Sequence, residues 1–241
     1  MPARLGGVAP PVVLLHGFAG SARHFSRVIE SLPPERFEPI ALEVADARPL
    51  TPDGVAALVG ASTSEPFALV GYSMGGRLAL HIALAMPERV SRLVLVSTGA
   101  GIEDSAARAA RRAADEALAA SVEEGPIEAF SERWSATPLF AQDPQWVKDE
   151  VAAEQLRCDP RTLAACLRAL GQAAFEPMWD RLGELSMPTA ILVGERDGAY
   201  VAAAERIAAA IPRSRLTVVR GVGHRVALEA PAAVAGALGG R

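Results

Sequence analysis

The segment Gly71-Tyr72-Ser73-Met74-Gly75-Gly76 fits the pattern G-x-S-x-G, which is typical of a reactive serine. An apolar run precedes it and an amphipathic stretch follows, so Ser73 is expected on a sharp turn from a strand into a helix. The small residues on either side allow the strand and the helix to approach closely. Such a turn can serve tight packing alone, but the flanking patterns favour a nucleophile or a base.

A serine hydroxyl needs a partner base to be reactive at neutral pH. Of the four histidines, His224 is best placed, because Gly221-Val222-Gly223-His224 directly follows the last predicted strand. Packing in a loop or a place on a helix surface is favoured for the others, which are His16, His24 and His81.

A histidine base needs a carboxylate that holds its tautomer and stabilises the imidazolium. Gly194-Glu195-Arg196-Asp197 follows the penultimate predicted strand, which produces the chain order Ser, Asp, His of a known triad architecture. We predict Asp197 for this role. Glu195 is the near alternative, with a surface charge as its favoured role.

A second glycine loop, Leu15-His16-Gly17-Phe18, ends the first apolar run. It would bring the amide of Phe18 beside the serine turn, so that the N–H groups of Phe18 and Met74 could stabilise an oxyanion. His-Gly alone is a weak motif, and it becomes informative in combination with the serine turn.

These loops must be positioned by a sheet. Short apolar runs typical of buried parallel strands cover 12–15, 67–70, 92–96, 189–193 and 216–219, and helical patterns over 74–86 and 201–211 separate several of them. Strands that alternate with helices predict an α/β fold with a mostly parallel, doubly wound sheet.

About ninety residues between the third and fourth of these strands break this alternation, and they carry helical patterns over 105–120, 126–134 and 145–157. A structureless loop of that length is uncommon. We therefore expect a helical cap, 99–186, inserted into a core formed by 1–98 and 187–241, over the edge of the sheet where ligands bind.

Composition excludes several classes. With 24 basic and 28 acidic side chains in 241 residues, a nucleic-acid partner is not expected. The start lacks an uninterrupted apolar segment, and no later run approaches a membrane span, so we expect a cytoplasmic protein without membrane attachment. No metal or cofactor motif is present. Cys158 and Cys166, predicted in one helix, would lie too far apart for a disulfide and are expected to be reduced packing residues.

The segment from Gly71 to Leu80 resembles that of the MenH family, α/β-hydrolases of the menaquinone pathway that make 2-succinyl-6-hydroxy-2,4-cyclohexadiene-1-carboxylate. The resemblance spans nearly the whole chain. It continues in these segments: Leu15 to Ser21, Arg111-Arg112, Asp115 to Ala119, Phe130 with Trp134, Pro138-Leu139-Phe140, Leu156-Arg157 and Leu167 to Gln172. It departs from the family in one loop: relatives usually carry a Gly-His-Gly element after their second long strand, and the matching segment here, Leu42 to Pro49, lacks it.

The resemblance implies a lyase that uses no cofactor and eliminates pyruvate from 2-succinyl-5-enolpyruvyl-6-hydroxy-3-cyclohexene-1-carboxylate, with Ser73 as the base. Fixed guanidinium groups suit this small anionic substrate with three carboxylates. By position, the residues implied in binding are Tyr72, Arg77, Arg111, Trp134 and Arg157, with Arg112 and Arg168 as alternatives for the cap arginines. Each arginine taken alone can also be a solvated helix charge.

Two other functions stay open. A carboxylesterase or related acyl hydrolase would use the same triad with Ser73 as a nucleophile in an apolar pocket. A non-catalytic receptor for a small ligand would keep the fold without turnover. A monomer or a small homo-oligomer is expected.

Overall fold

The computed structural model describes residues 9–239, and the outermost residues of the predicted core, 1–8 and 240–241, lie outside that range. Within it, six parallel strands form one sheet in the order β2-β1-β3-β4-β5-β6. The strands are β1 (Pro11–Leu15), β2 (Glu38–Leu42), β3 (Phe67–Tyr72), β4 (Val90–Val96), β5 (Thr189–Gly194) and β6 (Ser214–Val219). The predicted parallel α/β sheet is confirmed.

Strand β2 was not among the apolar runs that predicted strands. It lies at the edge of the sheet, its residues are half-buried or exposed, and it contains Pro39. An edge strand tolerates a proline because one side of its backbone pairs with no neighbour. The sequence of β2 therefore lacks the continuous apolar run that is typical of a fully buried strand.

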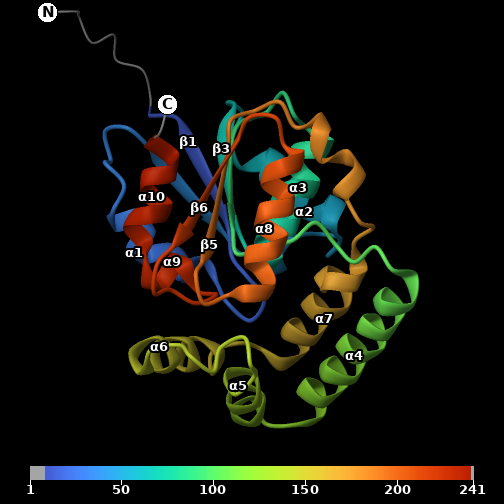
Figure 1. Ribbon diagram of the computed structural model, residues 1–241. Coiled ribbons are helices and arrows are strands. Elements are labelled where there is room, and N and C mark those ends of the chain that lie inside the picture. The colour runs from blue at the N-terminus through green and yellow to red at the C-terminus, as the bar shows by residue number, and fades with distance from the viewer. Residues whose placement is uncertain (1–8, 240–241) are drawn as a thin grey trace, which may run out of the picture.

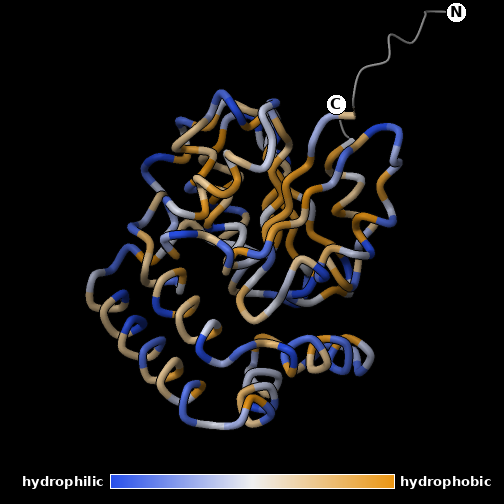
Figure 2. The backbone as a smooth tube through the Cα atoms, turned by 180° about the vertical axis from the view of Figure 1, so that it is seen from behind, coloured by the Kyte–Doolittle hydropathy of each residue, from blue (hydrophilic) through white to orange (hydrophobic). Residues whose placement is uncertain are grey.

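Two layers of helices cover the sheet (Figure 1). On one face lie α1 (Ser26–Glu30), α9 (Val226–Glu229) and α10 (Pro231–Gly239), and on the other lie α2 (Pro52–Ser62), α3 (Met74–Ala85) and α8 (Gly198–Ala210). Short 3-10 turns cover Ala22–Phe25, Val44–Asp46, Gln172–Ala174 and Trp179–Glu184. The apolar strands run through the middle of the molecule (Figure 2), and each face of the sheet has its own buried cluster.

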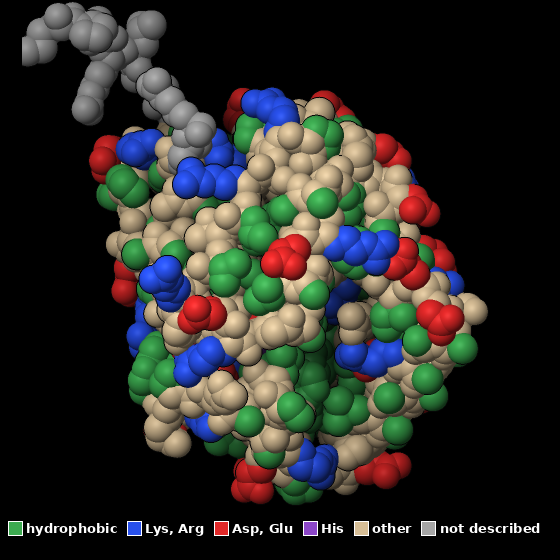
Figure 3. All heavy atoms as spheres, in the orientation of Figure 1, with side chains coloured by type: hydrophobic (Ala, Val, Ile, Leu, Met, Phe, Trp, Pro, Cys, Tyr) green, Lys and Arg blue, Asp and Glu red, His purple; other side chains and the backbone are tan. Residues whose placement is uncertain are grey.

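Four helices lie between β4 and β5 in the chain: α4 (Ser105–Glu124), α5 (Ile127–Ser135), α6 (Gln145–Gln155) and α7 (Pro160–Leu170). We call them the helical insertion. They form a separate layer beyond the carboxyl edge of the sheet (Figure 1). On the face shown in Figure 3, the surface is hollowed along the boundary between this layer and the core.

The prediction that Cys158 and Cys166 share one helix was wrong. Helix α6 ends at Gln155, and α7 begins at Pro160, with the side chain of Asp159 accepting the N–H of Thr162 at 2.8 Å. An aspartate cap followed by proline starts a new helix. Both cysteines are free thiols, and burial raises their pKa values to about 11.

Within residues 9–239, none of the helices has the length and apolar character that crossing a membrane requires.

Helix α3 and strand β1 approach so closely that only glycine fits between them. A Cβ atom on Gly75 would lie 2.0 Å from the carbonyl oxygen of Leu15, far inside van der Waals contact. The corresponding atom on Gly60, inside α2, would lie 3.7 Å from its nearest neighbour, the end of the Met86 side chain.

We predict that Gly75→Ala lowers the free energy of unfolding by about 3 kcal/mol, because two backbones must move apart. Its control, Gly60→Ala, should raise that free energy by about 0.5 to 1 kcal/mol, since alanine there costs less conformational entropy. Urea unfolding measures both. Equal effects of the two substitutions would contradict the close approach.

Candidate active site

The candidate site lies where the order of the sheet reverses. Strand β1 has β2 on one side and β3 on the other, so the connections after β1 and β3 leave the sheet toward opposite faces. Open α/β sheets bind ligands in the crevice at such a point, outside the carboxyl ends of the strands. Here the loop after β1 carries His16 to Phe18, and the turn after β3 carries Ser73.

Ser73 adopts the strained conformation that its motif predicts. Its φ of 53° and ψ of −110° lie in a region that side-chain-bearing residues rarely occupy. Both backbone polar groups of Ser73 are paired in this conformation, because its N–H donates to the Val96 carbonyl at 2.9 Å and the Thr98 hydroxyl donates to its carbonyl at 2.8 Å. The turn leaves the hydroxyl at the N-terminus of α3.

The three predicted triad residues meet. Nε2 of His224 lies 3.0 Å from Oγ of Ser73, and Nδ1 of His224 lies 2.6 Å from Oδ2 of Asp197. His224 and Asp197 are 1% and 4% exposed, so their hydrogen bond is shielded from water. The chain can therefore pass a proton from Ser73 to an imidazole whose other nitrogen faces a carboxylate.

Glu195, the alternative to Asp197, does not reach the histidine. Its Oε2 accepts the N–H of Gly221 at 2.9 Å, and the residue is exposed. It braces the loop that leads to His224 instead.

The other histidines have structural contacts. Nδ1 of His16 lies 2.8 Å from the carbonyl of Gly17, and its Nε2 accepts the N–H of Val44 at 3.3 Å. His24 is stacked on Tyr72 with ring centroids 4.8 Å apart, and burial lowers its pKa. His81 pairs with Asp53 on the surface at 2.8 Å.

Three aromatic rings enclose the imidazole of His224. The centroids of Tyr200, Tyr72 and Phe140 lie 4.5, 5.4 and 5.8 Å from its own. Two of these rings belong to the core, whereas Phe140 comes from the segment between α5 and α6 of the helical insertion. Burial raises the pKa of the Tyr72 phenol, which keeps that hydroxyl protonated.

A cavity of about 370 Å³ opens in front of Ser73, between the core and the helical insertion. Its walls include Phe18 and Met74, the residues predicted to form the oxyanion hole. Four of the five predicted binding residues also line it: Tyr72, Arg77, Arg111 and Trp134. The ring of Phe18 packs edge-on against Trp134 with centroids 5.2 Å apart, so the loop after β1 is held by the insertion.

Arg77 is an unusual cation, because it is only 5% exposed. Burial lowers the pKa of its guanidinium group, and the neighbouring Tyr200 opposes that shift. Among the described residues, its buried Nε has no hydrogen-bond partner, and its guanidinium carbon lies 5.7 Å from the centroid of the Phe175 ring. A buried cation in this state is suited to receive an anion.

Arg111 is held in place by its own helix and by the turn after α7. Its Nε donates to Oδ1 of Asp115 at 2.7 Å, and its Nη1 donates to Gln172 at 2.5 Å. Asp115 and Gln172 also line the cavity. The sequence analysis did not predict Tyr200 and Gln172 as individual site residues, because no local sequence pattern indicates their long-range contacts.

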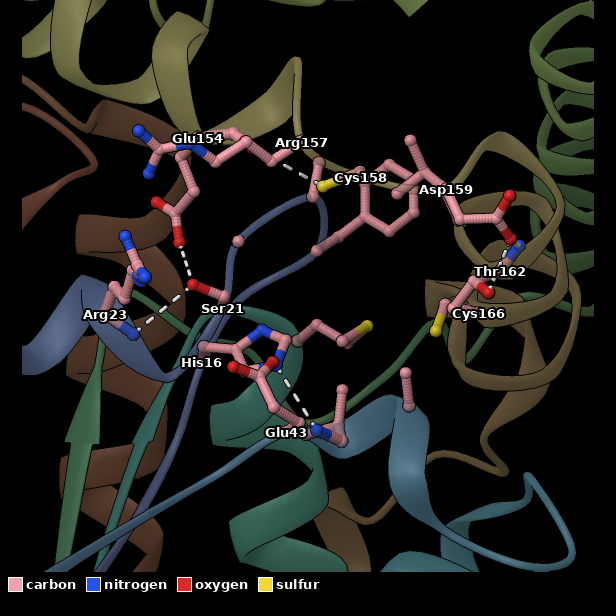
Figure 4. Close-up of a pocket in the computed structure, with 17 residues that line it drawn as sticks. His16, Ser21, Arg23, Glu43, Glu154, Arg157, Cys158, Asp159, Thr162 and Cys166 are labelled. Carbon is pink, nitrogen blue, oxygen red and sulfur yellow. Dashed lines mark hydrogen bonds and ion pairs between the residues drawn. The ribbon is translucent and has the colours of Figure 1, made fainter.

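Arg157 lies elsewhere. It lines a second cavity, also of about 370 Å³, which shares Phe18 and Met74 with the first but does not include Ser73. Figure 4 shows Glu154, Arg157 and Cys158 at the end of α6, with the loop after β1 opposite them. Val44 and Ala45, where the chain lacks the family's Gly-His-Gly element, form part of this wall.

Arg112 and Arg168, the alternatives for the cap arginines, make structural contacts. Arg112 donates to the carbonyl of Ala173 at 2.7 Å. Arg168 joins α7 to α4 through Glu116 and Glu123 at 2.8 and 2.7 Å, and neither cavity includes Arg112 or Arg168.

Comparison with known proteins agrees with the fold. A profile described as "Alpha/beta hydrolase family" matches residues 12–237. A putative 2-succinyl-6-hydroxy-2,4-cyclohexadiene-1-carboxylate synthase from Bacillus subtilis is 32% identical over 91% of this chain and 85% of its own. The synthase of that name from Klebsiella pneumoniae is 31% identical over 93% and 90%.

Among solved structures, MenH from S. aureus superposes with a TM-score of 0.89 at 28% identity, covering 98% of this chain and 95% of its own. A thermophilic esterase from Thermogutta terrifontis has a TM-score of 0.74 at 24% identity over 98% and 94%, which is a likeness of fold alone. The α/β-hydrolase fold and the resemblance to MenH expected from the sequence are confirmed.

The contrast between Asp197 and Glu195 can be tested without a substrate, through the rate at which a fluorophosphonate modifies Ser73. We predict that Asp197→Asn lowers this rate by roughly 10²- to 10⁴-fold, because an amide cannot stabilise the imidazolium and favours the wrong tautomer. Glu195→Gln keeps an oxygen for the Gly221 N–H, and the rate should change by less than about twofold. If Glu195→Gln instead caused the large fall in the modification rate, the assignment of Asp197 as the partner of His224 would be wrong.

Proposed function

The chain belongs to the α/β-hydrolase family. Within this family, we propose that it is a lyase that eliminates pyruvate from 2-succinyl-5-enolpyruvyl-6-hydroxy-3-cyclohexene-1-carboxylate. Its product would be that named in its relatives, 2-succinyl-6-hydroxy-2,4-cyclohexadiene-1-carboxylate. The proposal places the enzyme in the menaquinone pathway, with the helical insertion acting as a cap over the site.

The observation that carries the proposal is the buried guanidinium of Arg77 on the wall of the Ser73 cavity. A neutral ester would leave this cation, 5% exposed, without an anionic partner. A carboxylate would satisfy it through charge-assisted hydrogen bonds, and Arg111 offers a second cation in the same cavity. The cavity therefore favours a substrate with several carboxylates.

The geometry supports proton removal as the chemical step. His224 accepts the proton of the Ser73 hydroxyl, and the serine oxygen then takes a proton from a ring carbon of the bound substrate. The electrons of that C–H bond form a new ring double bond, the existing ring double bond shifts by one position, and the bond from the ring to the enolpyruvyl oxygen breaks. The enolate that leaves takes the proton held on His224 and becomes pyruvate, which restores the neutral imidazole. Asp197 stabilises the imidazolium while it holds the proton.

Negative charge grows on the substrate during this step, and we assign its stabilisation to the N–H groups of Phe18 and Met74. Both residues line the cavity, and the amide at the first position of α3 has no carbonyl within its own helix to pair with. Tyr72 and Trp134 supply apolar walls that exclude water from the reacting atoms.

Two assays on the wild type and on Ser73→Ala test the proposal: pyruvate release from the enzymatically generated substrate, and hydrolysis of p-nitrophenyl acetate. We expect fast pyruvate release that falls by at least about 10³-fold in Ser73→Ala, with feeble ester hydrolysis. Pyruvate release at the spontaneous rate beside robust, Ser73-dependent ester cleavage would instead make the protein a carboxylesterase that uses Ser73 as a nucleophile.

Arg77 gives the second test. Arg77→Met should lower kcat/KM for pyruvate release by about 10²-fold, because the substrate loses its buried carboxylate partner. Hydrolysis of p-nitrophenyl acetate, which carries no carboxylate, should not fall. The control Arg168→Met removes an exposed cation outside the cavity and should change kcat/KM by less than about twofold. Equal losses with the two arginine variants would remove the argument for an anionic substrate.

A further inference from the structure

The residue that follows His224 forms a buried ion pair with the helical insertion. Nε of Arg225 lies 3.0 Å from Oδ2 of Asp143, and the two side chains are 3% and 1% exposed. Asp143 lies just before α6, whereas Arg225 directly precedes α9 in the core. The pair therefore joins the insertion to the loop that carries the base.

This pair is expensive to bury, and it is one of several contacts between the insertion and the core. Exposed contacts between the same two parts already exist, such as Arg27 with Glu150 of α6 at 2.6 Å. Burial raises the pKa of the Asp143 carboxyl despite the opposing effect of Arg225, and among the described residues Nη1 of Arg225 has no hydrogen-bond partner. Buried ion pairs contribute little net stability and are better suited to defining one geometry.

The geometry in question is that of Phe140. The guanidinium carbon of Arg225 lies 4.1 Å from the centroid of the Phe140 ring, and the N–H of Asp143 donates to the Phe140 carbonyl at 3.1 Å. The same ring packs edge-on against His224. Both members of the ion pair thus hold the one aromatic neighbour of His224 that does not belong to the core.

The loop of the base is fixed from the same side. A Cβ atom on Gly223 would lie 3.3 Å from Oδ1 of Asp143, so the carboxylate rests directly over the backbone before His224. Oε1 of Glu229 accepts the Gly223 N–H at 3.0 Å. The carboxylate of Asp143 therefore contacts the arginine that follows His224 and covers the glycine that precedes it.

We propose that Arg225 and Asp143 are positioning residues, which hold Phe140 against His224 and thereby complete the enclosure of the base once the insertion is docked. The proposal rests on His224 being the base, but not on the identity of the substrate. Without the pair, the ring of Phe140 is released, water reaches the imidazole, and the base loses its orientation toward Ser73.

The experiment measures His224 without any substrate, so that its failure is distinct from failure of the proposed lyase activity. Diethyl pyrocarbonate modifies accessible neutral imidazoles, and peptide mass spectrometry gives the rate for each histidine. The variants are Asp143→Asn, Arg225→Met and the double variant. His81, half-buried and remote from the pair, serves as the internal reference. Arg27→Met is the matched control, because it breaks an exposed ion pair between the core and α6.

We expect each single variant to raise the modification rate of His224 relative to His81 by about tenfold, with no change in Arg27→Met. The limiting rate of Ser73 modification by a fluorophosphonate should fall by roughly 10- to 100-fold, with its half-saturating concentration unchanged. The double variant should be no worse than either single variant, because the two side chains act as one unit. Additive effects, or unchanged modification of His224, would overturn the proposal.

A further variant covers the case in which an unpaired buried charge prevents folding. Phe140→Leu leaves the ion pair intact, keeps an apolar side chain and removes only the ring. It should also raise the modification rate of His224 relative to His81. A folded Phe140→Leu protein with wild-type reactivity at His224 would overturn the proposal.

Discussion

The close packing of α3 against the end of β1 is the constraint on which the site depends. The carbonyl of Leu15 occupies the space that any side chain on Gly75 would need. This approach brings the amide-bearing loop after β1 beside the turn of Ser73, and it does so at the reversal point of the sheet. The strained backbone of Ser73 is tolerated because strands on both sides over-determine it. Close packing of the two backbones thus brings the reactive groups together.

Around that frame, the chain buries charge in three distinct ways. The pair of His224 with Asp197 is compensated within the core, and Arg225 with Asp143 is compensated across the boundary with the insertion. The third case is Arg77, whose charge the described residues compensate only in part. Under the proposed function, a bound anion would compensate the remaining charge of Arg77 at this one place in the cavity.

The sequence predicted what local patterns encode. Ser73, His224 and Asp197 each follow an apolar run, and the ends of parallel strands meet at one edge, so their proximity follows from the fold class. The half-exposed edge strand β2 lacks such a run, and the Asp159-Pro160 helix start was overlooked between Cys158 and Cys166. Arg157 lines a cavity other than that of Ser73, and Asp143 contacts Arg225. Both facts depend on how the insertion packs on the core, which residue spacing in the sequence does not predict.

The place of the insertion in the chain bears on how the protein tolerates change. Strands β4 and β5 are neighbours in the sheet, although α4 to α7 all lie between them in sequence. The entropy of closing such a loop grows only with the logarithm of its length, and a doubling adds about 0.6 kcal/mol. Lengthening or reshaping the insertion therefore hardly burdens the sheet, provided that its two ends still leave β4 and enter β5. Substrate range can diverge in this fold while the frame that holds the serine stays the same.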